Sequence, residues 1–235
     1  MLAFFYKENI DPAASVVTLD EDTSKHIVQV LRMKNGGQLQ LTDGKGHLLT
    51  AVITDDNRKR CQVNVLSGVH HPPPAANISI AISLIKNNSR FEWFLEKATE
   101  IGITTIIPLL SQRTEKQQFR FDRMKSVLVS AMLQSQQAWL PQLSLPVSID
   151  KLIASCNDEQ KFIAHCIDEE DKVQLVKLQP FKAAVILIGP EGDFTKEEID
   201  LALKNNFRPV AMGNTRLRTE TAGVVAATIL TQFHH

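Results

Sequence analysis

Cysteine is scarce in this chain, and no long apolar run is present. Its three cysteines, Cys61, Cys156 and Cys166, lie far apart and form no Cys-x-x-Cys pair. Neither a disulfide framework nor a zinc site is indicated, so we expect three small buried apolar residues and no metal. No apolar run reaches the roughly 20 residues of a membrane span, and the N-terminus lacks the pattern of a signal peptide. These absences favour a cytoplasmic protein without a membrane partner.

A net charge is also missing, because 26 Lys and Arg residues balance 26 Asp and Glu residues. This balance counts against a protein that coats nucleic acid non-specifically. The distribution is uneven, however, since residues 113–125 are rich in basic side chains and residues 150–200 in acidic ones. The basic stretch is either a surface that contacts phosphates or a solvated helix face. Its members are Arg113, Lys116, Arg120, Arg123 and Lys125.

Three successive prolines mark the one clear break in composition. They lie in HHPPPAA, residues 70–76, and a run of this kind cannot continue a helix or a central strand. We therefore predict a linker at 71–76, a first domain at 1–70 and a second domain at 77–235.

The two domains carry different strand patterns. In the first, the strand-like segments 38–43 and 47–54 are separated by glycine-containing turns, which is typical of a small antiparallel barrel that binds a partner. In the second, apolar strand candidates alternate with helical stretches, which favours an α/β domain with a mostly parallel sheet. The strand candidates are 78–85, 104–110, 161–167, 183–188 and 208–213, and the helical stretches are near 91–101, 121–138, 195–206 and 219–233.

The strand candidate at 183–188 ends in an unusual loop. It is a continuous apolar run, as expected for a strand covered on both faces, and it leads directly into GPEGD, residues 189–193. Thr195 followed by Glu198 forms a capping box, which predicts that a helix begins there. The loop is either a plain turn or a ligand site at the carboxyl end of a parallel strand.

A second glycine-containing loop, MGNTRLRTETAG, covers residues 212–223. Each loop alone fits a plain turn, but both together, with Arg216, Arg218 and Glu220 in the second, indicate two walls of one pocket. The dinucleotide fingerprint Gly-x-Gly-x-x-Gly and the phosphate loop that ends in Gly-Lys-Ser/Thr are absent. We therefore predict a pocket that does not hold a triphosphate.

These two loops resemble a known family signature. LIGPEGDFTKEEI, from Leu187, and MGNTRLRTETA, from Met212, are similar to the paired motifs of the SPOUT-superfamily ribosomal RNA small-subunit methyltransferase E family. EKATEIG, from Glu96, and HIVQVLRMKNGGQL, from His26, resemble two further family motifs, so the resemblance covers nearly the whole chain.

The resemblance implies both a fold and a reaction. The implied fold is an N-terminal PUA-like β-barrel followed by a C-terminal α/β SPOUT domain with a deep trefoil knot. The implied reaction is methylation of N3 of a uridine in small-subunit (16S) ribosomal RNA, with S-adenosylmethionine as the methyl donor. The family also implies a homodimer. Composition and periodicity show neither the knot nor the dimer.

Three positions depart from the family pattern. Asp193 stands where many members have a third glycine, and Arg216 lies one place further along the cofactor loop. Gln137 stands where the family often has arginine. We expect these differences to change contacts at the rim of the pocket and not the class of reaction.

The resemblance assigns the cofactor to the ends of three strands. Main-chain groups of the glycine loops would bind the adenine edge and the ribose, and Met212 and Leu217 would supply apolar walls. Each glycine is otherwise an ordinary turn residue, and His165 is otherwise a structural residue at a strand end. The expected cofactor-binding residues are Ala164, His165, Ile188, Gly189, Gly192, Met212, Gly213, Asn214, Arg216 and Leu217.

Methyl transfer to N3 of uracil requires alignment of the reactants and loss of a proton. An arginine would stabilise negative charge on the uracil oxygens, and a carboxylate would orient or accept the proton. The candidate catalytic residues are Arg218, Glu220 and Glu191. The alternative is an Arg218–Glu220 pair that only fixes the loop, and the sequence does not assign the general base.

RNA phosphates need basic side chains on the surface. The candidates are Lys7, Arg32 and Lys34 in the barrel and Arg113, Arg120 and Arg123 in the second domain, with scattered surface charge as the alternative.

Two other functions remain open at this point: a noncatalytic RNA-binding protein and a SPOUT methyltransferase that acts on transfer RNA. Binding of S-adenosylmethionine distinguishes the enzyme from a noncatalytic RNA-binding protein. An RNA assay distinguishes methylation of ribosomal RNA from methylation of transfer RNA.

The terminal helix candidate, TAGVVAATILTQF, is small and apolar over most of its circumference. A helix with one solvated face is less apolar, so we expect cover on several sides. The family resemblance implies that part of this cover is the partner subunit, and we expect Ala226 at that interface.

Overall fold

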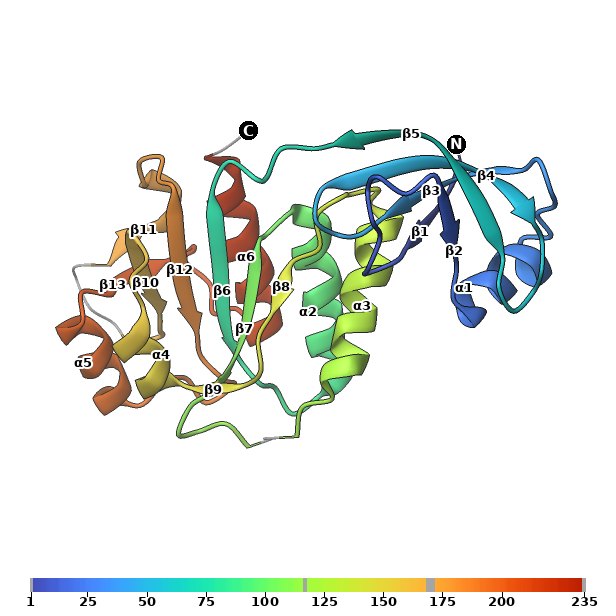
Figure 1. The fold of residues 1–235 in the computed structure, drawn as a ribbon. Helices are drawn as coiled ribbons and strands as arrows, with labels where there is room; N and C mark the ends of the chain where they lie inside the picture. Colours follow the sequence, from blue (N-terminus) through green and yellow to red (C-terminus); the bar gives the residue numbers. More distant parts are fainter. Residues whose placement is uncertain (1, 116–117, 168–171, 234–235) are drawn as a thin grey trace. The chain divides into compact units, whose positions relative to one another are not determined.

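The computed structural model describes residues 2–115, 118–167 and 172–233. The chain forms two compact units, which Figure 1 shows. The first combines Met1–Pro73 with Met132–Leu140, and the second combines Pro74–Ala131 with Pro141–His235.

The first unit is a five-stranded sheet in the order β1-β3-β4-β5-β2. Its neighbours are antiparallel except β1 and β3, where Ala3 pairs with Leu39 in a parallel register. The expected antiparallel barrel is therefore wrong for this pair, because the long connection between the two strands lets β3 return in the direction of β1. The strands are β1 Ala3–Tyr6, β2 Val16–Thr18, β3 Gln38–Thr42, β4 His47–Asp55 and β5 Gln62–His70.

Alternation along the strands builds the core of the first unit. Leu39 and Leu41 of β3 are fully buried, as period-two side chains on one sheet face should be. The helix α1, Glu21–Lys25, begins at Asp20, whose carboxylate accepts the backbone N–H of Thr23. It continues into a π-helix, η1, His26–Val30, which places the fully buried Ile27 against this core.

Residues 132–140 belong to the first unit, although they follow a helix of the second along the chain. Ala138 accepts the backbone N–H of Gly46, and Leu140 donates its backbone N–H to Gly44. The indole Nε1 of Trp139 donates to the carbonyl of Pro72 at 2.9 Å. The segment is thus hydrogen-bonded to the β3–β4 turn.

The second unit is built on an eight-stranded sheet. The main order is β11-β13-β10-β12-β6-β7-β8, and β9 pairs with β7. Every pairing described in this sheet is parallel, which agrees with the α/β pattern of the sequence. The strands are β6 Asn77–Ser83, β7 Thr105–Leu110, β8 Gln142–Leu143, β9 Val147–Ser148, β10 Gln160–Ala164, β11 Val173–Gln174, β12 Ala183–Ile188 and β13 Arg208–Ala211.

Helices cover both faces of this sheet (Figure 1). Val185 and Leu187 of β12 share a core cluster with residues of α4, Ile149–Ser155, and α5, Lys196–Lys204. On the other face, α6, Thr219–Gln232, contacts β6, β12 and the helix α2, Asn88–Ile101. The central strand β12 is therefore buried on both sides, which explains its unbroken apolar sequence. A short 3₁₀ helix, η2, covers Leu175–Lys177.

Helix boundaries follow local signals. The capping box at Thr195 and Glu198 is present and begins α5, as predicted. The helix α3 covers Phe121–Gln134 and ends before the predicted residue 138. The cause is Gln136, which has φ +57 and cannot continue a right-handed helix.

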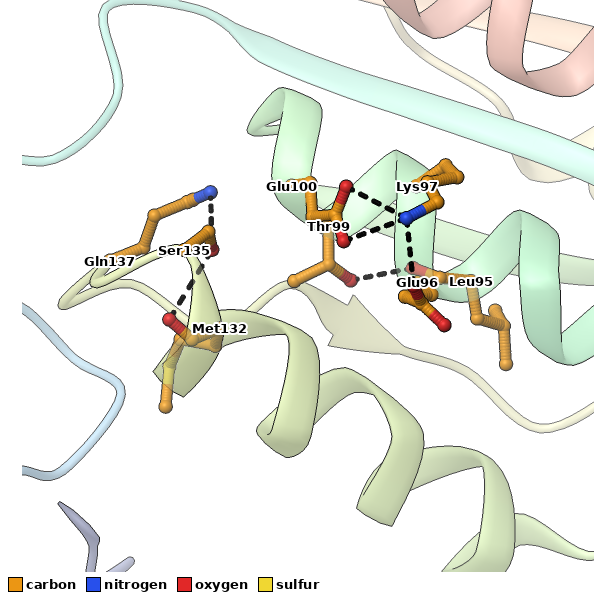
Figure 2. Close-up of polar contacts among 8 residues, drawn as sticks. All are labelled: Leu95, Glu96, Lys97, Thr99, Glu100, Met132, Ser135 and Gln137. Atoms are coloured by element: carbon orange, nitrogen blue, oxygen red, sulfur yellow. Dashed lines mark hydrogen bonds and ion pairs between the residues drawn. The ribbon is translucent and has the colours of Figure 1, made fainter. Parts of the chain in front are cut away.

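The EKATEIG motif forms the last two turns of α2 (Figure 2). Lys97 Nζ lies 2.7 Å from Glu96 Oε1 and 3.0 Å from Glu100 Oε1. The hydroxyl of the fully buried Thr99 donates to the Leu95 carbonyl at 2.8 Å. Gly102 then ends the helix with φ +94, a conformation that favours glycine. Within the motif, Gly102 therefore ends the helix, whereas the contacts of Lys97 and Thr99 lie inside it.

Candidate cofactor and RNA site

Three adjacent parallel strands end together and define the site. Ala164 of β10 is in register with Ile188 of β12 on one side and with Val210 of β13 on the other. The loops that follow these residues therefore leave the same edge of the sheet, at the carboxyl ends where open α/β sheets bind ligands.

These loops enclose a pocket of about 690 Å³. It brings together nine of the ten expected cofactor-binding residues from three separate parts of the chain. They are Ala164, His165, Ile188, Gly189, Met212, Gly213, Asn214, Arg216 and Leu217. Gly192 is the exception, because its exposed main chain faces Arg113, whose guanidinium Nη1 donates to the Gly192 carbonyl at 2.6 Å.

Two glycines of the pocket have different physical roles. Gly213 has φ +132, and a Cβ added there would meet no atom within 4 Å, so it would project into open space. Gly189 is confined instead, since a Cβ would lie 3.2 Å from the Phe194 ring and backbone. Gly213 thus keeps pocket space open, whereas Gly189 lets two parts of one loop approach closely.

The three candidate catalytic residues also line the pocket. Glu220 is 7% exposed and lies at the start of α6, where its Oε1 is 3.6 Å from Nε of Arg90. Arg218 is exposed at the N-cap of α6. Among the described ion pairs, none joins Arg218 to Glu220, so the alternative in which that pair fixes the loop is not what the geometry shows. Glu191 is exposed, and its Oε1 accepts the Lys86 backbone N–H at 3.4 Å.

Several pocket residues were not expected from the sequence. Arg90 lies far from both signature loops along the chain, so no local pattern marks it. Asp193 accepts the backbone N–H of Cys166, and Lys172 donates to the backbone carbonyl of His165. Cys166 also lines the pocket and is exposed, so the expectation of three buried cysteines is wrong at this position. It follows the last residue of β10 by only two positions, where the chain has already left the sheet.

The RNA-binding candidates differ in the contacts that their side chains already form within the protein. Arg123 forms a two-bond contact with Glu92, at 3.1 and 2.7 Å. This hydrogen bonding from Arg123 lowers the pKa of the Glu92 carboxyl below its ordinary value. Lys34 Nζ lies 3.6 Å from Asp56. Arg120 is exposed on the segment that leads into α3.

The remaining basic candidates are spread over both units. Lys7 is half-buried and donates its backbone N–H to Thr42, while Arg32 is exposed and has φ +55. Lys116 lies outside the described residues. Arg113 is a member of the basic stretch, and its guanidinium also donates to the Gly192 carbonyl in the loop after β12.

Within the described ranges, no helix is both long and apolar enough to cross a membrane. Nor do three or more His, Cys, Asp or Glu side chains gather there in a way that could hold a metal ion.

Known families match both units. A family model described as an RNA methyltransferase domain covers residues 71–231, and one described as an RNA methyltransferase PUA domain covers residues 19–66. The chain belongs to the RNA methyltransferase family. This membership, with the parallel sheet, confirms the α/β methyltransferase domain and the PUA-like N-terminal domain predicted from the sequence.

Individual relatives match over almost the full length of this RNA methyltransferase. A probable rRNA-methyltransferase from Porphyromonas gingivalis is 36% identical, with a TM-score of 0.91 and coverage of 99% of this chain and 98% of that one. Ribosomal RNA small subunit methyltransferase E from Neisseria gonorrhoeae, solved with S-adenosyl methionine, is 26% identical, with a TM-score of 0.88 and the same coverage. The enzyme of that name from Synechocystis sp. is 29% identical over 218 residues, which is 90% of this chain and 71% of the relative.

Proposed function

We propose that this RNA methyltransferase transfers a methyl group from S-adenosylmethionine to N3 of a uridine in small-subunit (16S) ribosomal RNA. The observation that carries the proposal is the pocket at the ends of β10, β12 and β13, together with family membership. Relatives that align over nearly the whole chain are described as small-subunit rRNA methyltransferases, and one was solved with S-adenosyl methionine. The choice of N3 rests on the resemblance of the two signature loops.

The residues present fit S-adenosylmethionine. The open space beside Gly213 and the half-buried Met212 and Leu217 suit the adenosyl group, whose flat adenine ring needs one close main-chain wall and apolar surfaces. Ala164 and Ile188 form the floor at the strand ends. When bound, this cofactor supplies an electrophilic methyl group on a sulfonium sulfur.

The chain's own residues would prepare the uridine. Arg218 at the pocket wall would bind the uracil oxygens and stabilise the negative charge that grows on them. Glu220 or Glu191 would orient or accept the N3 proton. Glu220 is the better enclosed of the two, and its Oε1 lies 3.6 Å from Nε of Arg90 at the pocket wall.

The two domains would have different roles. The PUA-like barrel at 1–70, with Lys7, Arg32 and Lys34, would bind RNA phosphates, and the linker at 71–76 would connect it to the SPOUT domain at 77–235. Arg113, Arg120 and Arg123 would add a second basic surface. The deep trefoil knot is part of this proposal for the SPOUT domain.

The proposed enzyme is a homodimer that acts on rRNA. The expectation that Ala226 lies at the dimer interface is wrong. Its side chain is fully buried within the second unit, because α6 lies against α2, β6 and β12. Thr228 is an exposed residue of the same helix. Sedimentation at micromolar concentration tests the dimer. A monomeric wild type would contradict it, and a dimer that Thr228→Glu dissociates would place α6 at the interface.

Two assays test the reaction. Calorimetry should show binding of S-adenosylmethionine and S-adenosylhomocysteine to the purified protein. The substrate test uses small-subunit RNA from a strain without this gene, radiolabelled cofactor and mass spectrometry of the nucleosides. We expect N3-methyluridine at one position. Absence of cofactor binding would overturn the enzyme proposal, while a methylated transfer RNA and unmodified ribosomal RNA would overturn the substrate.

A further inference from the structure

The loop after β10 leaves the sheet at Ala164, and β11 begins at Val173. Within this loop, His165 and Cys166 line the pocket directly. Two charged side chains bind the backbone of these two residues. Lys172 Nζ donates to the His165 carbonyl at 2.7 Å, and Asp193 Oδ2 accepts the Cys166 N–H at 2.7 Å.

Asp193 comes from the neighbouring loop, after β12, and this makes its contact a link between two walls of the pocket. Its other carboxylate oxygen accepts the backbone N–H of Phe194 at 2.8 Å. Its own backbone N–H donates to Pro190 at 3.0 Å and closes a turn. Both carboxylate oxygens are therefore used, one within the loop and one across to Cys166.

The backbone of Asp193 indicates that its side chain is needed. Its φ is +64, in the left-handed region that glycine enters without strain and that other residues rarely adopt. Asp tolerates this region better than most residues because its short carboxylate forms local hydrogen bonds. A glycine here would relieve the backbone but would leave the Cys166 N–H without this acceptor.

We propose that Asp193 is a positioning residue that fixes the His165–Cys166 wall against the β12 loop, so that the pocket is shaped before S-adenosylmethionine enters. This rests on the proposed function, because it assigns that cofactor to this pocket. A binding site held in its bound shape loses less conformational freedom when the ligand arrives, so affinity rises without a new contact. Charge-assisted hydrogen bonds to the backbone are stronger than neutral ones and suit this purpose.

Three substitutions separate this role from ordinary loop stability. Asp193→Gly removes the link and the backbone strain, Asp193→Ala removes the link and keeps the strain, and Asp193→Asn keeps one acceptor oxygen. Asn206 provides a matched control, since it is exposed, has the same φ of +64 and does not line the pocket. Asn206→Gly therefore makes the same backbone change away from the site.

We expect Asp193→Gly and Asp193→Ala to weaken S-adenosylmethionine binding by about tenfold, a loss that corresponds to about 1.4 kcal/mol. Asp193→Asn should restore part of the affinity, and Asn206→Gly should bind like wild type. The melting temperature should fall less for Asp193→Gly than for Asp193→Ala. If affinity instead followed melting temperature across the series, Asp193 would have only a structural role and the proposal would be overturned.

Amide hydrogen exchange without cofactor provides an independent readout. The Cys166 N–H should exchange faster in Asp193→Gly than in wild type and should be unchanged in Asn206→Gly. Equal protection in Asp193→Gly would overturn the link itself. A wild type that binds no S-adenosylmethionine would defeat the proposed function and with it the cofactor role, whereas normal binding by Asp193→Gly would defeat only the inference.

Discussion

Arg90 of α2 and Glu220 of α6 meet at the wall of the pocket, with 3.6 Å between the guanidinium Nε and the carboxylate Oε1. Glu220 is buried, whereas 43% of the Arg90 side chain is exposed to solvent. This arrangement joins the helix that carries the EKATEIG motif to the helix that follows the second signature loop.

Glu220→Gln tests the carboxylate. If Glu220 accepts or orients the N3 proton, methyl transfer in a single turnover should fall by about 10²-fold, the usual size of a general acid–base contribution. Cofactor affinity, measured by calorimetry, should stay within about twofold of the wild-type value, since the amide has nearly the same shape. A normal transfer rate would assign the role to Glu191 or to another group.

Arg90→Met tests the partner of that carboxylate. Loss of the cation leaves Glu220 without its ion pair, so we expect a drop of about tenfold in single-turnover rate, consistent with about 1.4 kcal/mol of lost stabilisation. Lys97→Met is the control, because Lys97 is also ion-paired on α2 but does not line the pocket. Equal losses in both variants would mean that α2 as a whole is disturbed.

Gly213→Val tests the open side of the pocket. The new side chain would project into open space, where the proposed function puts the adenosyl group, so calorimetry should detect no cofactor binding while the protein remains folded. The positive φ of Gly213 adds strain, and Gly36→Val controls for it, since Gly36 has φ +86 and equally open surroundings in the first unit. Unchanged affinity in Gly213→Val would place the cofactor elsewhere.

Gly223→Ala tests the packing behind the pocket. A Cβ at Gly223 would lie 2.6 Å from the Phe94 ring and 2.9 Å from Ile82, so α6 would have to move away from α2 and β6. Overpacking of this kind costs about 1–3 kcal/mol, which outweighs the gain of about 1 kcal/mol from replacing a helical glycine by alanine. Thermal unfolding should show a lower melting temperature. Gln232→Ala, at an exposed site of α6, should leave it nearly unchanged.

Arg120→Gln combined with Arg123→Gln tests the basic surface near α3. RNA affinity should fall and its salt dependence should become shallower, because fewer phosphates are neutralised. Cofactor affinity should not change. Lys151→Gln with Lys204→Gln removes the same charge from α4 and α5, on the opposite face of the sheet, and should leave the salt slope as it is in wild type. Equal slopes in the two double variants would rule out a specific RNA role for Arg120 and Arg123.

Asp43 gives the first unit a defined acid sensitivity. Burial alone raises the pKa of Asp43, but hydrogen bonds from the Lys45 backbone and the His47 side chain lower it below its ordinary value. A lowered folded pKa means that the stabilisation is complete above the unfolded pKa of about 3.9 and is lost as pH falls through the folded pKa. Asp43→Asn should be less stable by about 2 kcal/mol at neutral pH. This difference should shrink below about pH 4 in denaturant titrations.

The repeating patterns of the sequence predicted most of the second unit. The unbroken apolar run of β12 and the capping box at Thr195 are local signals, so the strand, its loop and the start of α5 were found in the right places. The two glycine loops also predicted most of the pocket, because both follow strands that end at one sheet edge.

Features that depend on distant parts of the chain were not predicted. Arg90 reaches the pocket only because α2 packs against α6, and no spacing in the sequence records that contact. The parallel pairing of β1 with β3 depends on chain direction, which an alternating strand pattern does not encode. Ala226 was expected at an interface because a helix that is apolar all round does not reveal which side faces its own sheet.

The hydrogen bonds of residues 132–140 to the β3–β4 turn mean that the chain crosses between the two units three times. The PUA-like unit and the methyltransferase unit are consequently interleaved along the sequence and are not consecutive modules. Cutting the chain at the proline-rich break would release a barrel whose Gly44 carbonyl and Gly46 N–H have lost their partners. The remaining fragment would carry Trp139 without the Pro72 carbonyl that it binds. Recombination that exchanges the barrel of one relative for another must therefore exchange this inserted segment with it.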